Sequence, residues 1–306
     1  MNTTPSFTHT LRQRWQAADS MLCVGLDPDP ARIPAHLGTG PEAIDRFCRD
    51  IIAATADTVC AFKPQIAYFA AQGAEDVLAG LIAHIHAEHP GIPVILDAKR
   101  GDIGSTARQY GVEAFDRFKA DALTLSPFMG FDSIEPYFEW AGRGLILLCR
   151  TSNPGGNDLQ ALSVLPAGDT TGTPPGAQSP RQSASDTASS AQPEKLYEHL
   201  ARLAAGPWNV SGELGLVVGA TFPDELARVR ALAPRLPLLV PGVGAQGGDV
   251  NATVRAGLDA DGYGLVINSS RAILYAGQGT DFADQARKAA VATRDAIRAA
   301  RDAARA

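Results

Sequence analysis

The composition of this chain argues against several classes of protein. Its 306 residues include 45% hydrophobic and 20% charged residues, and its formal net charge is −6. This balance supplies an apolar core large enough for one α/β barrel. The chain has no basic tract that could follow a phosphate backbone, which argues against nucleic-acid binding. A small anionic ligand needs only a local site and stays compatible with this charge.

The cysteines and the apolar runs indicate the cellular compartment. The four cysteines share no CxxC spacing, which is typical of free thiols in a reducing compartment: they are Cys23, Cys48, Cys60 and Cys149. No apolar run is long enough to span a membrane, and the polar stretch Met1–Trp15 lacks the apolar core of a signal peptide. We therefore expect a cytoplasmic protein without a membrane partner.

Short apolar runs with the character of strands recur along the chain. In chain order they are Met21–Leu26, Val59–Lys63, Pro93–Asp97, Ala122–Leu125, Gly144–Cys149, Gly215–Gly219, Leu238–Val240 and Gly264–Ile267. Amphipathic segments lie between most of them, such as Pro41–Thr58, Gly73–Glu88 and Ser105–Ala120. This alternation predicts a parallel sheet, and eight repeats predict an α/β fold of the (β/α)8 TIM-barrel type, as a single domain over residues 1–306. An open doubly wound sheet is the weaker alternative, because Asp27-Pro28-Asp29-Pro30 stands where its glycine fingerprint would be.

Two segments depart from the barrel repeat. From about Pro166 to Gln192 the chain is dominated by Gly, Pro, Ser, Thr, Ala and Gln, without apolar periodicity. This composition predicts a disordered insertion after the fifth strand, a neutral insert rather than a functional lid. The segment Phe282–Ala306 is rich in Ala and Arg with interspersed Asp, which predicts a helix with a solvated charged face.

The most informative stretch is Asp97-Ala98-Lys99-Arg100-Gly101-Asp102, which follows an apolar run. Strand alternation points Asp97 and Lys99 to the same side, and Asp102 follows in the next turn. Carboxylates around a lysine can keep it protonated as an acid, although a structural ion-pair cluster has the same pattern. Asp27 and Lys63 end the first and second strands. Five charges at one rim favour an active site, because burying charge is costly.

Two further loops indicate a phosphate site. Pro241–Asp249 follows the seventh strand and contains small residues whose amides can form an anion nest. Asn268-Ser269-Ser270-Arg271 follows the eighth strand, and the Arg271 guanidinium can hold a phosphate with a forked pair of hydrogen bonds. Loops in these two positions form the phosphate site of many barrels, which favours this interpretation over a turn and a helix cap. Thr151–Gly156 follows the fifth strand and is a candidate for contacting a polar ligand edge.

These motifs together resemble the orotidine 5′-phosphate decarboxylase family, in its longer bacterial type (type 2). Asp97–Thr106 is similar to the family's Asp-x-Lys-x-x-Asp signature in its Lys-Arg-Gly-Asp-Ile-Gly form. Further stretches match the family in order: Val24–Asp29, Phe62–Gln65, Thr151–Gly155, Pro241–Gly248 and Ser269–Arg271. The resemblance covers nearly the whole chain apart from the insertion and the C-terminal end.

The resemblance implies an activity and a set of catalytic residues. It implies a carboxy-lyase that converts orotidine 5′-phosphate to uridine 5′-phosphate and CO2 in pyrimidine biosynthesis, with no metal, flavin or pyridoxal cofactor. The resemblance implies that Lys99 is the general acid that protonates the carbanion at C6. Asp97 and Asp102 flank it, and Lys63 bridges the ribose and Asp97.

The same resemblance implies substrate contacts and a homodimer. Asp102 and Thr106 would complete the site of the neighbouring subunit, with Thr106 at the ribose. The other expected contacts are Asp27 with a ribose hydroxyl, Ser152 with the pyrimidine, and Gln246 and Arg271 with the 5′-phosphate, beside backbone amides near Gly244 and Ser270.

Two other functions are compatible with parts of the pattern. A lyase of the same superfamily acting on a sugar phosphate would share Asp-x-Lys-x-x-Asp but use magnesium. The Lys-Arg-Gly-Asp-Ile-Gly form and the Ser-Asn-Pro-Gly loop argue against it. A non-catalytic barrel that binds a phosphorylated ligand would not need two carboxylates around a lysine.

Overall fold

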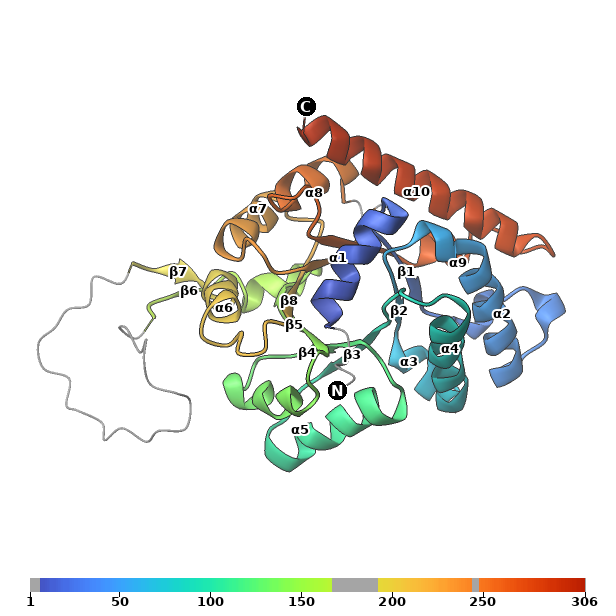
Figure 1. The fold of residues 1–306 in the computed structure, drawn as a ribbon, viewed down its shortest axis with the longest axis horizontal. Coiled ribbons are helices and arrows are strands. Elements are labelled where there is room, and N and C mark those ends of the chain that lie inside the picture. Colours follow the sequence, from blue (N-terminus) through green and yellow to red (C-terminus); the bar gives the residue numbers. More distant parts are fainter. Residues whose placement is uncertain (1–5, 167–191, 244–247, 306) are drawn as a thin grey trace, which may run out of the picture.

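Eight parallel strands form a nearly closed barrel (Figure 1). The computed structural model describes residues 6–166, 192–243 and 248–305. The barrel strands are β1 (Leu22–Leu26), β2 (Ala61–Pro64), β3 (Ile95–Arg100), β4 (Ala122–Leu125), β5 (Gly144–Arg150), β8 (Leu214–Val218), β9 (Leu238–Pro241) and β10 (Leu265–Ser269). Their order is β2-β1-β10-β9-β8-β5-β4-β3, and parallel bridges from Phe62 to Val94 and from Gln65 to Asp97 join the two ends. The eight predicted strands and the predicted (β/α)8 barrel are confirmed.

Helices surround the barrel (Figure 1). They are α1 (Phe7–Ala18), α2 (Gly40–Thr55), α3 (Ile66–Ala70), α4 (Glu75–Glu88), α5 (Gly104–Gly111), α6 (Leu196–Ala205), α7 (Pro223–Leu232), α8 (Val250–Gly257), α9 (Arg271–Leu274) and α10 (Phe282–Arg305). In α2, for example, Ile44, Phe47 and Ile51 are buried at helical spacing. The helix predicted over Ser105–Ala120 is divided, because α5 continues as a π-helical segment over Val112–Arg117.

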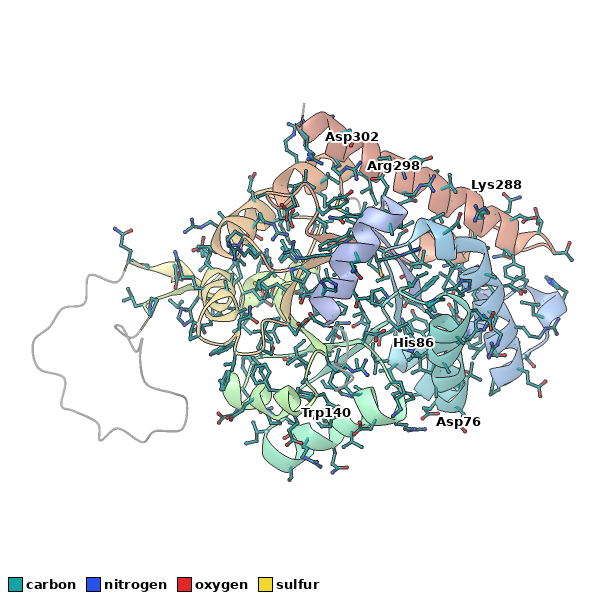
Figure 2. All side chains as sticks on the ribbon, viewed as in Figure 1. Asp76, His86, Trp140, Lys288, Arg298 and Asp302 are labelled. Atoms are coloured by element: carbon teal, nitrogen blue, oxygen red, sulfur yellow. The ribbon has the colours of Figure 1, made fainter. Side chains whose placement is uncertain are left out.

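Helix α10 confirms the predicted C-terminal helix, and one arginine departs from its solvated charged face. Figure 2 shows charged side chains such as Lys288 and Asp302 along this helix. Arg301, however, does not belong to a solvated face, since it is only 8% exposed. Its Nη1 lies 2.5 Å from Asp19 Oδ1 at the end of α1, and its guanidinium faces the Tyr263 ring. A long arginine side chain can thus bury its stem and still pair its charge.

The expected insertion begins and ends at neighbouring points of the fold. Residues 167–191 lie outside the described residues, and they include nearly all of the segment predicted to be disordered. On either side of them, β6 (Ser163–Val164) and β7 (Glu194–Lys195) pair as an antiparallel ribbon. The chain therefore leaves the barrel between β5 and α6 and returns at the same place, as an insertion after the fifth barrel strand would.

The cysteines are buried, as expected of thiols that pack in a core. All four cysteines are buried and free. Burial raises the pKa of the Cys23 thiol to about 12, so this thiol is neutral and packs as a small apolar group. Within the described ranges, no helix is long and apolar enough to cross a membrane.

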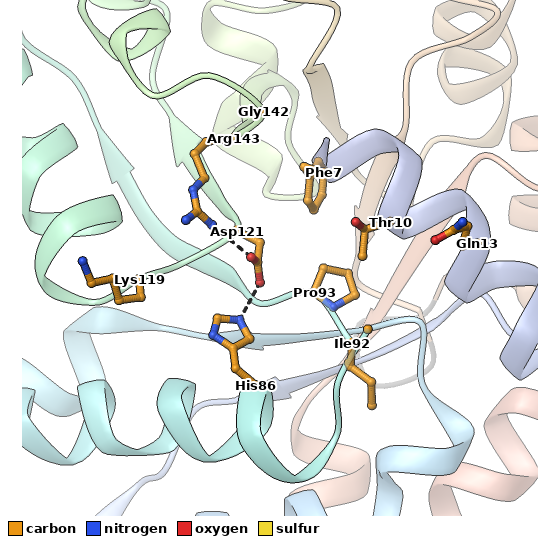
Figure 3. A pocket seen from close by; sticks show the side chains of 11 residues that line it. Phe7, Thr10, Gln13, His86, Ile92, Pro93, Lys119, Asp121, Gly142 and Arg143 are labelled. Atoms are coloured by element: carbon orange, nitrogen blue, oxygen red, sulfur yellow. Dashed lines mark hydrogen bonds and ion pairs between the residues drawn. The ribbon is translucent and has the colours of Figure 1, made fainter. Parts of the chain in front are cut away.

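Helix α1 and a cluster of hydrogen bonds around the Asp121 carboxylate lie at the N-terminal end of the barrel. Asp121 Oδ2 accepts a hydrogen bond from Val94 N at 2.8 Å and lies 2.8 Å from His86 Nε2 of α4. Its Oδ1 accepts one from Arg143 Nη1 at 3.0 Å. Figure 3 shows this cluster beside Phe7 of α1, in a cavity of about 430 Å³. One carboxylate therefore joins α4 to the beginnings of β3, β4 and β5, at the barrel face associated with stability.

We expect the substitution Asp121→Ala to lower the free energy of unfolding by about 1–3 kcal/mol, because Val94 N–H and the Arg143 guanidinium lose their partner. Urea denaturation of the purified variant measures this. Asp76→Ala is the matched control, since Asp76 is fully exposed and lies 3.7 Å from Arg117. Equal denaturation midpoints for both variants and the unaltered chain would contradict the role of Asp121.

Candidate active site

Two adjoining cavities open at the C-terminal ends of the barrel strands. One has a volume of about 510 Å³ and is lined by residues of β3, β4, β5 and the loop after β5. The other has about 350 Å³ and lies among the ends of β1, β9 and β10. Lys63, Asp97 and Pro241 line both, so the two cavities form one continuous site. This is the barrel face at which TIM-barrel enzymes hold their substrates.

The centre of the site is a carboxylate held between two ammonium groups. Lys63 Nζ donates to Asp97 Oδ2 at 2.7 Å, and Lys99 Nζ donates to Asp97 Oδ1 at 2.6 Å. Thr124 Oγ1 also donates to Asp97 Oδ1, at 3.0 Å. The Lys63 side chain is 5% exposed, whereas that of Lys99 is 46% exposed and lines the larger cavity. Lys63 is therefore largely enclosed although it lines both cavities, and Lys99 is the more open of the two to a ligand.

The charges of this cluster hold one another in place. Burial of Lys63 disfavours its charge, but Asp97 and Asp27 outweigh that effect and raise its pKa. Burial also disfavours the Asp97 carboxylate, but Lys63 and Lys99 outweigh it and hold its pKa well below the usual range. Both groups are charged at neutral pH. A depressed carboxylate pKa contributes stability above about pH 4, and that contribution is lost as the pH falls towards the folded-state value.

The backbone around Lys99 differs from the regular strand that the sequence predicts. Lys99 has a φ of 47° and Asp102 a φ of 96°, in the left-handed region that non-glycine residues avoid. The register of β3 against β4 shifts between Leu96 and Arg100, and Ala98 N and Lys99 N both donate to Thr124 Oγ1. Asp97 and Lys99 do meet, as expected. The reason is a local bulge held by Thr124 rather than simple strand alternation.

The smaller cavity contains acceptors that have no partner. Asp27 Oδ1 and Asn268 Oδ1 are buried, and neither has a hydrogen-bond partner among the residues that the structure describes. Asp27 follows β1, and Tyr275 holds that turn because its hydroxyl donates to Asp27 O at 2.7 Å. Buried acceptors without partners are costly. Both residues also line the smaller cavity, but these two oxygens have almost no accessible surface and lie behind the cavity wall.

Another part of the wall of the smaller cavity is basic and polar. Ser270 and Arg271 line it, directly after β10. Ser270 Oγ accepts a hydrogen bond from Asn268 Nδ2 at 3.2 Å. Arg271 is exposed, and its guanidinium has no hydrogen-bond or ion-pair partner within the described part of the chain. An unpaired guanidinium beside a serine is suited to a phosphate group.

The other predicted site residues fall into three groups. Ser152 lines the larger cavity in the loop after β5. Asp102 and Thr106 line neither cavity, and Asp102 Oδ1 instead accepts from Ile103 N at 2.8 Å. Within one chain, Asp102 therefore does not flank Lys99. Gly244 and Gln246 lie outside the described residues.

Two residues of the site were not predicted from the sequence as having roles of their own. Thr124 positions Asp97 and Lys99, and Asn268, named only as part of the loop after the eighth strand, lines the smaller cavity. Thr124 is a polar residue in an otherwise apolar strand, and this signal was available. Among the described residues, no group of three or more His, Cys, Asp or Glu side chains could hold a metal ion.

Comparisons with known proteins show the family of this chain. Residues 20–172 match the family described as Orotidine 5′-phosphate decarboxylase / HUMPS family. The chain is 63% identical to the orotidine 5′-phosphate decarboxylase of Azoarcus sp. (strain BH72) over 291 residues, 95% of this chain and 98% of that protein. The corresponding protein of Dechloromonas aromatica is 60% identical over 292 residues, 95% of this chain and 98% of that protein.

A solved structure extends the similarity to three dimensions. The OMP decarboxylase of Leishmania donovani aligns with a TM-score of 0.76 at 40% identity, covering 97% of this chain and 99% of that one. Sequence and structure thus agree over nearly the full length of each relative. The chain belongs to the orotidine 5′-phosphate decarboxylase family.

Proposed function

We propose that this chain is a carboxy-lyase that converts orotidine 5′-phosphate to uridine 5′-phosphate and CO2. Its membership of the family supports this activity. The observation that carries the proposal is the Asp97 carboxylate between the Lys63 and Lys99 ammonium groups, at the mouth of a barrel. We also propose that the chain forms a single barrel domain.

The two cavities fit the two halves of the substrate. The 5′-phosphate is placed at Arg271 and Ser270, with Gly244 and Gln246 proposed to complete this site. The Asp27 carboxylate, which lines the smaller cavity, accepts from a ribose hydroxyl, and Lys63 bridges the ribose and Asp97. The pyrimidine occupies the larger cavity, against Ser152. This orientation brings C6 of the ring towards Asp97 and Lys99.

The proposed chemistry is a decarboxylation followed by protonation. The bond between C6 and the carboxylate carbon breaks, CO2 departs, and the electron pair stays on C6. The Lys99 ammonium stabilises this charge and donates a proton from Nζ to C6, after which solvent restores that proton. Lys99 is the general acid because its side chain is open to the cavity, whereas Lys63 is enclosed. The charged Asp97 lies where the substrate carboxylate must fit, and the repulsion between them is relieved when CO2 leaves.

The proposed working unit is a homodimer with shared sites. Asp102 and Thr106 lie outside both cavities of their own chain, which is compatible with their reaching a neighbouring site. Exposed apolar side chains lie near Asp102: Ile103, the next residue, is 49% exposed, and Phe128 is 76% exposed. Ser126 N donates to Arg100 O at 2.7 Å, which places the Pro127–Met129 segment beside this turn. A second copy of the chain would cover these side chains and bring Asp102 to Lys99 of its partner.

The direct test of the proposed function is an ultraviolet assay of the purified protein with orotidine 5′-phosphate, with and without a chelator. We expect loss of the orotate chromophore at the same rate in both. A rate that depends on added magnesium, with a sugar phosphate as the better substrate, would support the lyase alternative instead.

We expect Lys99→Ala to lower the turnover number by about 10³-fold or more, because the charge and the proton beside C6 are both lost. Binding of uridine 5′-phosphate, measured by calorimetry, should change little. Lys288→Ala removes an exposed lysine of α10 and serves as the matched control. Turnover of Lys99→Ala near that of the control would refute the assigned role.

We expect Arg271→Ala to weaken binding of uridine 5′-phosphate by about 10- to 100-fold, the effect of losing hydrogen bonds to a charged group. Uridine, which has no phosphate, should bind both proteins equally in the same calorimetric experiment. Arg255→Ala, in α8, is the control for loss of an exposed arginine. Equal affinities of Arg271→Ala and the control for the nucleotide would exclude a phosphate contact.

Mixing two inactive variants tests the shared site. We expect Lys99→Ala and Asp102→Asn each to be nearly inactive alone. After subunit exchange roughly half of the dimers are mixed, and each has one intact site, so roughly a quarter of the original activity should return. No recovery in mixtures that contain mixed dimers by native mass spectrometry would show that Asp102 acts within its own subunit.

A further inference from the structure

A buried arginine at the end of β5 has no part in the proposed chemistry. Arg150 is the last residue of this strand and is 1% exposed. Its guanidinium carbon lies 4.0 Å from the centroid of the Phe222 ring, and its Nε is paired with Glu225 of α7. Burying a full charge is costly unless several partners compensate it, so this position has a specific requirement for the guanidinium.

The remaining nitrogens of Arg150 bind the loop that follows it. Nη2 donates to Asn157 Oδ1 at 2.5 Å, and Nη1 donates to Gln160 Oε1 at 3.4 Å. Asn157 belongs to the short helical turn Pro154–Asp158, and Gln160 follows this turn. One planar group thus connects α7 on one side with the middle and the end of the loop on the other.

Gln160 in turn closes the loop on its own beginning. Its Oε1 accepts from Thr151 N at 2.9 Å, and its Nε2 donates to Thr151 Oγ1 at 2.9 Å. Thr151 Oγ1 also donates to Asn153 Oδ1 at 2.7 Å. The hydrogen bonds between Thr151 and Gln160 therefore hold the two ends of the segment Thr151–Gln160 together, and the Arg150 guanidinium contacts this segment through Gln160.

The packing of Gly156 shows how closely the loop lies on the guanidinium. A Cβ at this position would be 2.9 Å from Arg150 Nη1 and 2.9 Å from Gln160 Oε1. Ser152, Asn153, Gly155 and Gly156 all line the larger cavity. A displacement of the guanidinium would therefore move the wall against which the pyrimidine is placed.

We propose that Arg150 is a positioning residue that sets the shape of the segment Thr151–Gln160 over the pyrimidine end of the site. This inference rests on the proposed function, which places the base in the larger cavity. Arg150 acts through Gln160 and Asn157 and lines neither cavity itself. Only a planar fork reaches Glu225, Asn157 and Gln160 at once, so a lysine does not replace it.

The test compares two ligands that differ in the base. Uridine 5′-phosphate carries the pyrimidine, and ribose 5-phosphate does not, so the ratio of their inhibition constants reports the pyrimidine wall alone. For Arg150→Met we expect binding of uridine 5′-phosphate to weaken about tenfold or more while that of ribose 5-phosphate is unchanged, and kcat/KM to fall by about 10²-fold. Arg150→Lys should change the ratio of inhibition constants as Arg150→Met does, because a lysine has no planar fork.

Arg230→Met is the matched control for loss of a buried arginine. Arg230 of α7 is 8% exposed, and its guanidinium donates to Leu236 O and Gly264 O, each at 2.8 Å. These carbonyl groups precede β9 and β10, at the opposite end of the barrel from the site. We expect this variant to lose thermal stability and to keep the ratio of the two inhibition constants.

The outcomes separate this inference from the proposed function. If the unaltered chain neither decarboxylates orotidine 5′-phosphate nor binds uridine 5′-phosphate, the proposed function fails. If it does both and the ratio is the same in Arg150→Met, the positioning role is overturned. Should Arg150→Met not fold, Asn157→Ala decides, because Asn157 is exposed and its loss removes one contact with the guanidinium. A changed ratio in Asn157→Ala supports the role, and an unchanged one overturns it.

Discussion

The carboxylate of Asp97 is the group on which the rest of this site depends. It is buried, and it accepts hydrogen bonds from Lys63, Lys99 and Thr124. Without its charge, two ammonium groups would face each other in a poorly solvated space, and Lys63 could not stay charged at 4% exposure. Three strands contribute to this one cluster, Lys63 from β2, Asp97 and Lys99 from β3 and Thr124 from β4. Their alignment therefore requires a closed and rigid barrel.

The two ends of the barrel differ in how well their polar groups are satisfied. At the N-terminal end, both oxygens of Asp121 are paired, and the Arg230 guanidinium donates to several backbone carbonyl groups. At the C-terminal end, buried oxygens of Asp27 and Asn268 have no partner among the described residues. The paired groups of Asp121 and Arg230 thus stabilise the end of the barrel opposite the site.

Backbone conformation and loop anchoring contribute as much to the site as the charged side chains do. Lys99 and Asp102 adopt positive φ values, which cost free energy unless the surroundings impose them. Hydrogen bonds from Ala98 N and Lys99 N to Thr124 impose the first of these. In a similar way, the segment after β5 is held by the side chains of Arg150 and Gln160 rather than by a strand or a long helix. Such side-chain anchors keep an irregular segment in one conformation over a cavity.

The sequence by itself determined the eight strands, the barrel and the charged positions Asp27, Lys63, Asp97 and Lys99, because strand periodicity and polar residues at strand ends are local signals. It also predicted a phosphate site at Ser270 and Arg271, which line the smaller cavity. Only the tertiary structure decided that Thr124 holds the bulge at Lys99, that Asn268 faces the smaller cavity and that Arg301 is buried against Asp19. These contacts join residues up to 282 positions apart. No local pattern encodes such pairings, because they depend on how the barrel closes and on which side chains then meet.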